Sequence, residues 1–161
     1  MSDSRVSLTR RIAASPADVF AVITDPRRHV DIDGSGMLMA TDAGPLRAVG
    51  DSFDMDMDRE PLGDLPMGKY KVRNTVTKLV PDSILEWNVG GIDQPPFGHV
   101  YGYELQSIEP GVTDVTHYCD WTGVRASSIR DRFPIVPVHM LEKSLDNLQR
   151  IATSSGERLH P

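Results

Sequence analysis

The sequence predicts an α+β domain in which a curved antiparallel sheet of about six to seven strands wraps round one long C-terminal helix. Most of the chain alternates polar and apolar residues with a period of two, which is typical of strands with one solvated face. The segment 136–155 changes to the spacing of an amphipathic helix. Two short helical segments stand between the first strand and the rest of the sheet.

Length and composition indicate a single folded domain over residues 1–161, with 39% hydrophobic and 25% charged residues. The net charge of −6 argues against a nucleic-acid partner. No apolar run approaches the roughly 18 residues of a membrane span. The first eleven residues lack the apolar core of a secretory signal, and the single Cys119 allows no internal disulfide. We therefore expect a cytoplasmic protein.

The N-terminal part predicts a strand followed by two short helices. Polar and apolar residues alternate over 6–12. Ser15 is a typical helix cap and Pro16 suits the first helical position, so a helix should begin there. It should end near Asp25 and Pro26, and a second short helix is expected over 26–31.

Strands dominate the middle of the sequence. The segment 51–60 alternates apolar residues with three aspartates, which we interpret as a solvated face balanced by lysine or arginine on the neighbouring strand. The segments 67–80 and 83–90 repeat the pattern. The segments 99–108 and 114–124 form a hairpin whose turn contains Pro110 and Gly111.

The C-terminal helix determines the predicted architecture. Leu141, Leu145, Leu148 and Ile151 recur at helical spacing. A sheet with one polar face must bury the other, and this is the only long amphipathic helix in the sequence. One helix is narrower than a sheet of six or seven strands, so we expect an apolar cavity to remain between them.

Three stretches resemble a known family: RRIAASPADVFAVITDPRRHVDIDGSG, YGYELQSIEPGVTDVTHYCDW and MLEKSLDNLQRIA. They are similar to the START-like, or Bet v 1-like (SRPBCC), helix-grip superfamily, and within it to the polyketide cyclase/dehydrase and lipid transport group. The resemblance implies a helix-grip fold over essentially the whole chain and a lipid-like or polyketide-like ligand. The superfamily includes lipid and sterol carriers, aromatase/cyclases and activator-of-Hsp90 co-chaperones, and it shares no catalytic motif.

Strand alternation assigns side chains to the cavity, because the charged residues of each strand should face water. The predicted ligand-binding residues are methionines, aromatic residues, histidines and aliphatic residues from strands and last helix: Met39, Met55, Met57, Tyr70, Val72, Trp87, His99, Tyr101, Tyr103, His117, Trp121, Leu141 and Leu145. Methionine adapts to irregular ligands; the alternative is that these methionines fill gaps in the core.

The hairpin brings together the candidates for chemistry. Its turn places Tyr103 opposite His117 or one diagonal away, and Tyr101 near Cys119 or Trp121. His117, Tyr103 and Tyr101 are therefore the candidate catalytic residues, as acid/base groups. The alternatives are a ligand-orienting role, which we favour, and a structural histidine–tyrosine pair. Cys119 is expected to be buried and unreactive.

We expect neither a metal nor a cofactor. The five histidines lack metal-binding spacing, and no phosphate-binding loop or dinucleotide fingerprint is present. The segment 31–42 resembles a calcium-binding EF-hand loop, but Pro26 and Pro45 oppose the flanking helices. We interpret 29–39 as the crossing from the short helices into the sheet, with Gly34 and Gly36 permitting a tight backbone.

The sequence therefore predicts a protein that binds a small hydrophobic or aromatic molecule in an internal cavity. The alternatives are a polyketide aromatase/cyclase or dehydratase that uses cavity histidine and tyrosine, and a co-chaperone-like protein-interaction module. The expected partner is a small hydrophobic molecule, and a homodimer is also allowed. Leu65 and Phe97, which are apolar residues in long loops, are candidates for a lid over the cavity.

Overall fold

The computed structural model describes residues 4–63 and 68–158. In chain order its elements are β1 (Arg5–Ile12), α1 (Pro16–Ile23), α2 (Pro26–Ile32), β2 (Leu38–Ala40), β3 (Ser52–Asp58), the 3-10 helix η1 (Glu60–Leu62), β4 (Lys69–Val80), β5 (Ile84–Gly91), β6 (Pro96–Glu109), β7 (Val112–Asp120), α3 (Ser127–Arg130) and α4 (Val138–Arg158).

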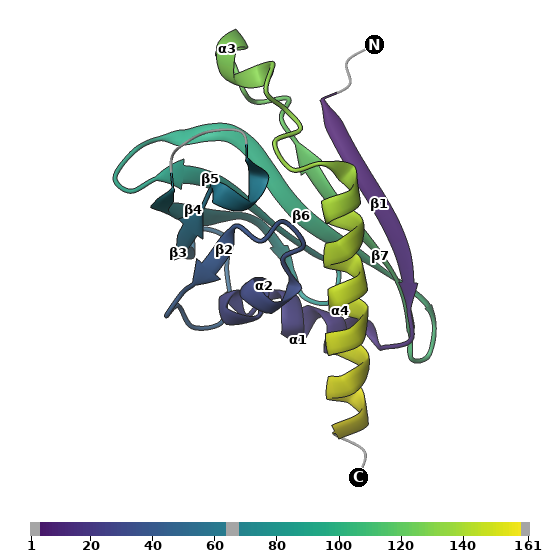
Figure 1. Cartoon of the computed structure of the whole chain (residues 1–161). Helices are drawn as coiled ribbons and strands as arrows, with labels where there is room; N and C mark the ends of the chain where they lie inside the picture. Colours follow the sequence, from purple (N-terminus) through teal and green to yellow (C-terminus); the bar gives the residue numbers. More distant parts are fainter. Residues whose placement is uncertain (1–3, 64–67, 159–161) are drawn as a thin grey trace.

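The strands form one seven-stranded antiparallel sheet in the order β1-β7-β6-β5-β4-β3-β2. The sheet curves, and α4 runs along its concave side (Figure 1). The predicted helix-grip architecture is therefore confirmed. Its short helix α3, between β7 and α4, was not predicted. Among the described helices, none is both long enough and apolar enough to cross a membrane.

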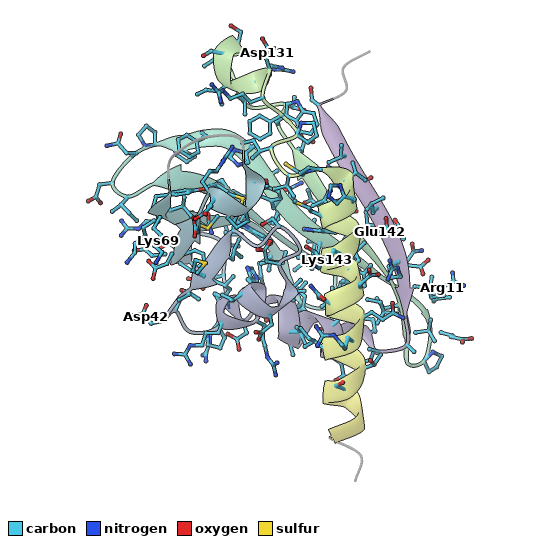
Figure 2. The ribbon with its side chains drawn as sticks, in the orientation of Figure 1. Arg11, Asp42, Lys69, Asp131, Glu142 and Lys143 are labelled. Carbon is cyan, nitrogen blue, oxygen red and sulfur yellow. The ribbon has the colours of Figure 1, made fainter. Side chains whose placement is uncertain are left out.

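The acidic row of β3 lies on the solvated face of the sheet, as the alternation predicts. Arg73 of β4 binds both carboxylate oxygens of Asp54, at 2.7 and 3.0 Å. Lys71 lies 3.3 Å from Asp56 on the same pair of strands. Arg11 on β1 and Lys69 on β4 lie at opposite margins of the molecule (Figure 2). Exposed ion pairs of this kind contribute little to stability. The charged side chains are found here because this face is solvated.

The two short helices begin where their capping residues stand. The Ser15 hydroxyl accepts a hydrogen bond from the Asp18 N–H at 3.1 Å, and the Asp25 carboxylate accepts one from the Arg27 N–H at 3.1 Å. A proline follows each cap at the first helical position. Both helices contact α4, and they close one end of the groove beneath it.

The packed core fills the groove at this closed end. Val19 and Ile23 of α1 and Ile32 of α2 are buried there together with Leu145 and Leu148 of α4. Towards its N-terminus, α4 contributes Leu141, which faces open space instead of packed side chains. The groove is therefore filled near α1 and α2 and hollow towards α3.

The segment between α2 and β2 is a tight crossing against α4, as predicted. A Cβ on Gly34 would lie 2.2 Å from the Met140 carbonyl oxygen, so only glycine fits there. The Asp33 carboxylate accepts hydrogen bonds from the N–H and hydroxyl of Ser35, at 2.9 and 2.7 Å, and from the Leu38 N–H at 3.1 Å. Its oxygens therefore organise the turn.

One site on the convex face is buried, although the alternation predicts a solvated face there. Tyr118 of β7 is 1% exposed and lies over Gly102 of β6. Its hydroxyl donates to Glu86 at 2.5 Å, and the Arg5 guanidinium covers its ring at 3.9 Å. A cation over an aromatic face is attractive, so Glu86 and Arg5 hold the ring in the place that the glycine leaves open.

We expect Gly102→Ala to destabilise the protein by roughly 1–3 kcal/mol, because the new methyl would meet the Tyr118 ring and hydroxyl at 2.5 Å. Urea unfolding measures the change. Gly44→Ala is the matched control, since a Cβ there has nothing within 4 Å. It should change stability by less than about 0.5 kcal/mol. Equal losses in the two variants would contradict the close packing over Gly102.

Candidate ligand-binding site

A cavity of about 460 Å³ lies between the concave side of the sheet and α4. Its walls come from strands β3 to β7, from the crossing between α2 and β2, and from the chain between α3 and the first turn of α4. This volume is in the range of small-molecule sites, roughly 300–1,000 Å³. Voids in a packed core are rarely larger than a water molecule, so this space is not a packing defect.

Most of the residues predicted for the cavity meet around it. The structure places ten of them in its lining: Met55, Met57, Tyr70, Val72, Trp87, His99, Tyr101, Tyr103, His117 and Leu141. They come from β3, β4, β5, β6, β7 and α4, so the fold brings together side chains that are far apart in the sequence.

Three predicted lining residues lie elsewhere. Met39 is 47% exposed, because β2 begins with Leu38 facing inward and the next residue therefore faces outward. Trp121 follows the end of β7 and stacks on Phe133 at 5.7 Å, in a small separate cluster. Leu145 lies one turn after Leu141 on α4 and belongs to the packed core.

Trp87 is the centre of an aromatic wall. Its ring lies 6.1 Å from Tyr103, 6.3 Å from Tyr101 and 4.9 Å from His29, measured between ring centroids. His99 continues the wall with its edge against Tyr101 at 5.6 Å. Flat polarisable faces of this kind stack on aromatic or conjugated ligands.

His117 is held by the hairpin in the predicted register, directly opposite Tyr103. The two rings stack at 4.1 Å with an interplanar angle of 8°. The Nδ1 atom of His117 lies 2.9 Å from the Gly102 carbonyl oxygen. A carbonyl only accepts, so Nδ1 carries the proton and Nε2 keeps its lone pair. Burial lowers the pKa of His117 to about 4, so the ring is neutral at pH 7.

Two buried polar atoms at the cavity lack partners among the described residues: Asn74 Oδ1 and His99 Nδ1. Unpaired buried polar atoms are costly, so each needs a water or ligand contact. Burial lowers the pKa of His99 to about 4. Asn74 was not predicted. It shares the inward parity of Val72 and Val76 on β4, and this parity could have identified it.

Other lining residues could not be found from strand alternation because they lie on helices and loops. His29 of α2 is buried, and its Nε2 lies 2.6 Å from the Ile23 carbonyl oxygen. Burial lowers its pKa. Asp33, Met37 and Arg59 also line the cavity, from the crossing before β2 and from the end of β3. Helical or irregular segments carry no period-two signal that shows which side chain faces inward.

The open end of the cavity is surrounded by apolar side chains from two segments. Phe97, at the start of β6, lines the cavity and is 45% exposed. Ile129 faces it from α3, and Phe133 and Ile135 face it from the chain between α3 and α4. Phe97 therefore lies where a lid residue would be needed, and its role as a lid stays a prediction. The other candidate, Leu65, lies outside the described residues.

Nucleophilic and metal chemistry find little support in the site. Burial raises the pKa of the Cys119 thiol to about 12, so it is protonated at neutral pH. Burial also raises the pKa of Tyr101, which lies opposite Cys119 on the neighbouring strand. Within residues 4–63 and 68–158, no three His, Cys, Asp or Glu side chains are grouped to hold a metal ion.

No protein-family model matches the chain. A stretch of 118 residues, 73% of the chain, is 36% identical to the uncharacterized protein Rv0088 of Mycobacterium tuberculosis, of which it covers 47%. The chain thus spans about half the length of the curated relatives it matches.

Solved structures share the fold at low sequence identity. The Zhui aromatase/cyclase from Streptomyces sp. R1128 is 12% identical with a TM-score of 0.63, over 92% of this chain and 93% of that one. The AHSA1-like protein from Aeromonas hydrophila is 17% identical with a TM-score of 0.58, over 94% of both chains. At these identities the likeness shows the fold alone.

The neutral buried histidines should make stability depend on pH. The pKa of His117 is about 4 in the folded protein and about 6.5 when unfolded, so the unfolded chain binds more protons between these values. The free energy of unfolding should fall as pH drops from about 6.5 towards 4, by up to roughly 3 kcal/mol for this residue.

His117→Asn removes the titrating ring but can still donate to the Gly102 carbonyl. The wild type should have a higher free energy of unfolding than His117→Asn at pH 7, and this difference should shrink as pH falls. Urea unfolding at several pH values measures it. His139→Asn, at an exposed histidine of α4, is the control. A wild-type advantage over His117→Asn that stays constant from pH 7 to 4.5 would contradict a neutral buried ring.

Proposed function

We propose that this chain, which has the helix-grip fold of the START-like, or Bet v 1-like, superfamily, binds one small hydrophobic or aromatic molecule in the cavity between its sheet and α4. The observation that carries the proposal is the cavity of about 460 Å³ with a mainly apolar and aromatic lining. A space of this size that the chain leaves unfilled favours a ligand, because burying apolar ligand surface there is favourable.

The lining favours flat or flexible apolar ligands. The aromatic wall round Trp87 supplies faces for stacking, and Met55 and Met57 of β3 adapt to irregular shapes. The cavity exposes little polar surface, and the rings of His99 and His117 are neutral. Neutral polar groups can orient a ligand without a large desolvation penalty.

An aromatase/cyclase or dehydratase activity is the alternative, with His117 and Tyr103 as an acid/base pair. An efficient base has a pKa near the working pH. Burial lowers the pKa of His117 to about 4 and raises the pKa of Tyr103, so each group is held in its neutral form. Their rings also meet face to face, which orients them but provides no path for a proton between them. These properties favour binding over catalysis.

A co-chaperone-like interaction module is the third possibility. Such a protein acts through its surface, and its groove can be filled by its own side chains. In this chain α1 and α2 fill only one end of the groove, and the lining at the other end surrounds an open space. The cavity therefore favours a ligand-binding role.

The proposal predicts that the protein binds the neutral fluorescent probe N-phenyl-1-naphthylamine at one site, and that native mass spectrometry of the freshly purified protein shows a bound small molecule. Val72→Trp should weaken probe binding at least tenfold, because the indole would occupy the cavity. Val80→Trp is the matched control, since the same substitution on β4 is made at a residue that is 53% exposed. Its affinity should equal that of the wild type.

Thermal unfolding of both variants checks that they are folded. The proposal is wrong if the probe does not bind and no small molecule co-purifies, or if Val72→Trp and Val80→Trp bind the probe equally well.

A further inference from the structure

We infer that the ligand carries a hydroxyl group, such as a phenol or enol, whose proton it donates to Nε2 of His117. This inference rests on the proposed function and defines its ligand class: a hydrogen-bond donor on an aromatic or conjugated skeleton. The alternatives would be a purely apolar ligand, a ligand with acceptors only, or a carboxylate.

The first step is the fixed direction of the His117 hydrogen bonds. Its Nδ1–H donates to the Gly102 carbonyl at 2.9 Å, and this carbonyl belongs to the neighbouring strand of the sheet. The ring is further held by the Tyr103 ring, stacked on it at 4.1 Å. His117 lines the cavity, and its Nε2 has no hydrogen-bond partner in the described part of the chain. Nε2 of His117 therefore remains for a ligand, as a hydrogen-bond acceptor in a fixed position.

His29 of α2 repeats this arrangement next to Trp87. Its Nε2–H donates to the Ile23 carbonyl at 2.6 Å, which leaves Nδ1 as the acceptor. Its ring is fixed between Phe53, at 5.4 Å, and Trp87, at 4.9 Å. Each of these two buried histidines thus donates one ring N–H to a backbone carbonyl and keeps a lone pair on its other nitrogen. They lie on different elements, and both line the cavity.

Asn74 adds an independent observation. Its side chain lines the cavity and is 6% exposed, and Oδ1 has no partner among the described residues. A buried carbonyl oxygen without a donor is costly, and a ligand hydroxyl would relieve that cost. The tyrosine hydroxyls of the lining can donate or accept, so they place no restriction on the ligand.

An anionic ligand is the competing class because three cationic residues also line the cavity: Arg59, Arg132 and Lys71, which is paired with Asp56. Against it stand the fixed acceptors of His117 and His29 and the Asp33 carboxylate, which lines the same space. A carboxylate would meet lone pairs at these positions, whereas a neutral hydroxyl would meet partners.

The test compares three probes of one shape on the wild-type protein at pH 7, by isothermal titration calorimetry: 2-naphthol, which donates; 2-methoxynaphthalene, which only accepts; and 2-naphthoate, which is anionic. We expect 2-naphthol to bind about tenfold more tightly than each of the others, as one well-formed hydrogen bond to a buried acceptor would give. This ranking needs no variant, so it stands even if a substitution disturbs folding.

His117→Asn then tests the assigned atom, because its amide can still donate to Gly102 but it lacks Nε2. The roughly tenfold preference for 2-naphthol over 2-methoxynaphthalene should be lost in this variant, whatever its affinity for 2-methoxynaphthalene. His139→Asn, at an exposed histidine on α4, should leave all three affinities unchanged.

The possible outcomes separate this inference from the proposed function. If 2-methoxynaphthalene or 2-naphthoate binds as tightly as 2-naphthol, or if His117→Asn keeps the preference for 2-naphthol, the hydroxyl assignment is wrong and the ligand-binding function stands. If 2-naphthol does not bind while N-phenyl-1-naphthylamine does, the hydroxyl assignment alone is wrong; if no probe binds, N-phenyl-1-naphthylamine included, and no small molecule co-purifies, both are wrong.

Discussion

The packing of one helix against a seven-stranded curved sheet is the constraint on which the rest of this structure depends. The apolar stripe of α4 covers only part of the concave face. The short helices α1 and α2 fill the groove at one end, where Val19 and Ile32 join the core. Among the residues that the structure describes, no such helix fills the other end, and the cavity of about 460 Å³ is the result. The candidate site is therefore a consequence of the architecture and needs no dedicated domain.

The same burial determines the chemistry of that site. The histidine and tyrosine side chains inside the groove are kept neutral, because a charge there is poorly solvated. Burial lowers the pKa of His117 to about 4, and the Gly102 carbonyl determines which of its nitrogens bears the proton. The groove thus offers oriented lone pairs on an aromatic wall, an arrangement suited to positioning a ligand. Proton transfer at neutral pH would need a more basic imidazole.

Strand residues of the site were predictable because side chains alternate, and the hairpin turn at Gly111 sets Tyr103 opposite His117. The prediction was wrong at short strands, at strand ends and on the helix, where alternation does not show which side chains face the cavity. Met39 lies on the three-residue strand β2, which is too short for alternation to show its inward side, and Trp121 follows the end of β7. Along α4, periodicity identified the buried face but not the level at which the cavity ends, so Leu145 was included. His29 lies on a helix, where its contact with Trp87 depends on tertiary packing alone.

Gly102 connects the two faces of the sheet. On the convex face its missing side chain admits the Tyr118 ring, which Glu86 and Arg5 hold in place. On the concave face its carbonyl accepts the proton of His117 Nδ1. A shift of this residue would therefore change both the outer packing and the orientation of the imidazole in the cavity. The polar network on the convex face stabilises the strands that carry Gly102 and His117, which gives a physical reason for burying a tyrosine and a glutamate on a face that is otherwise solvated.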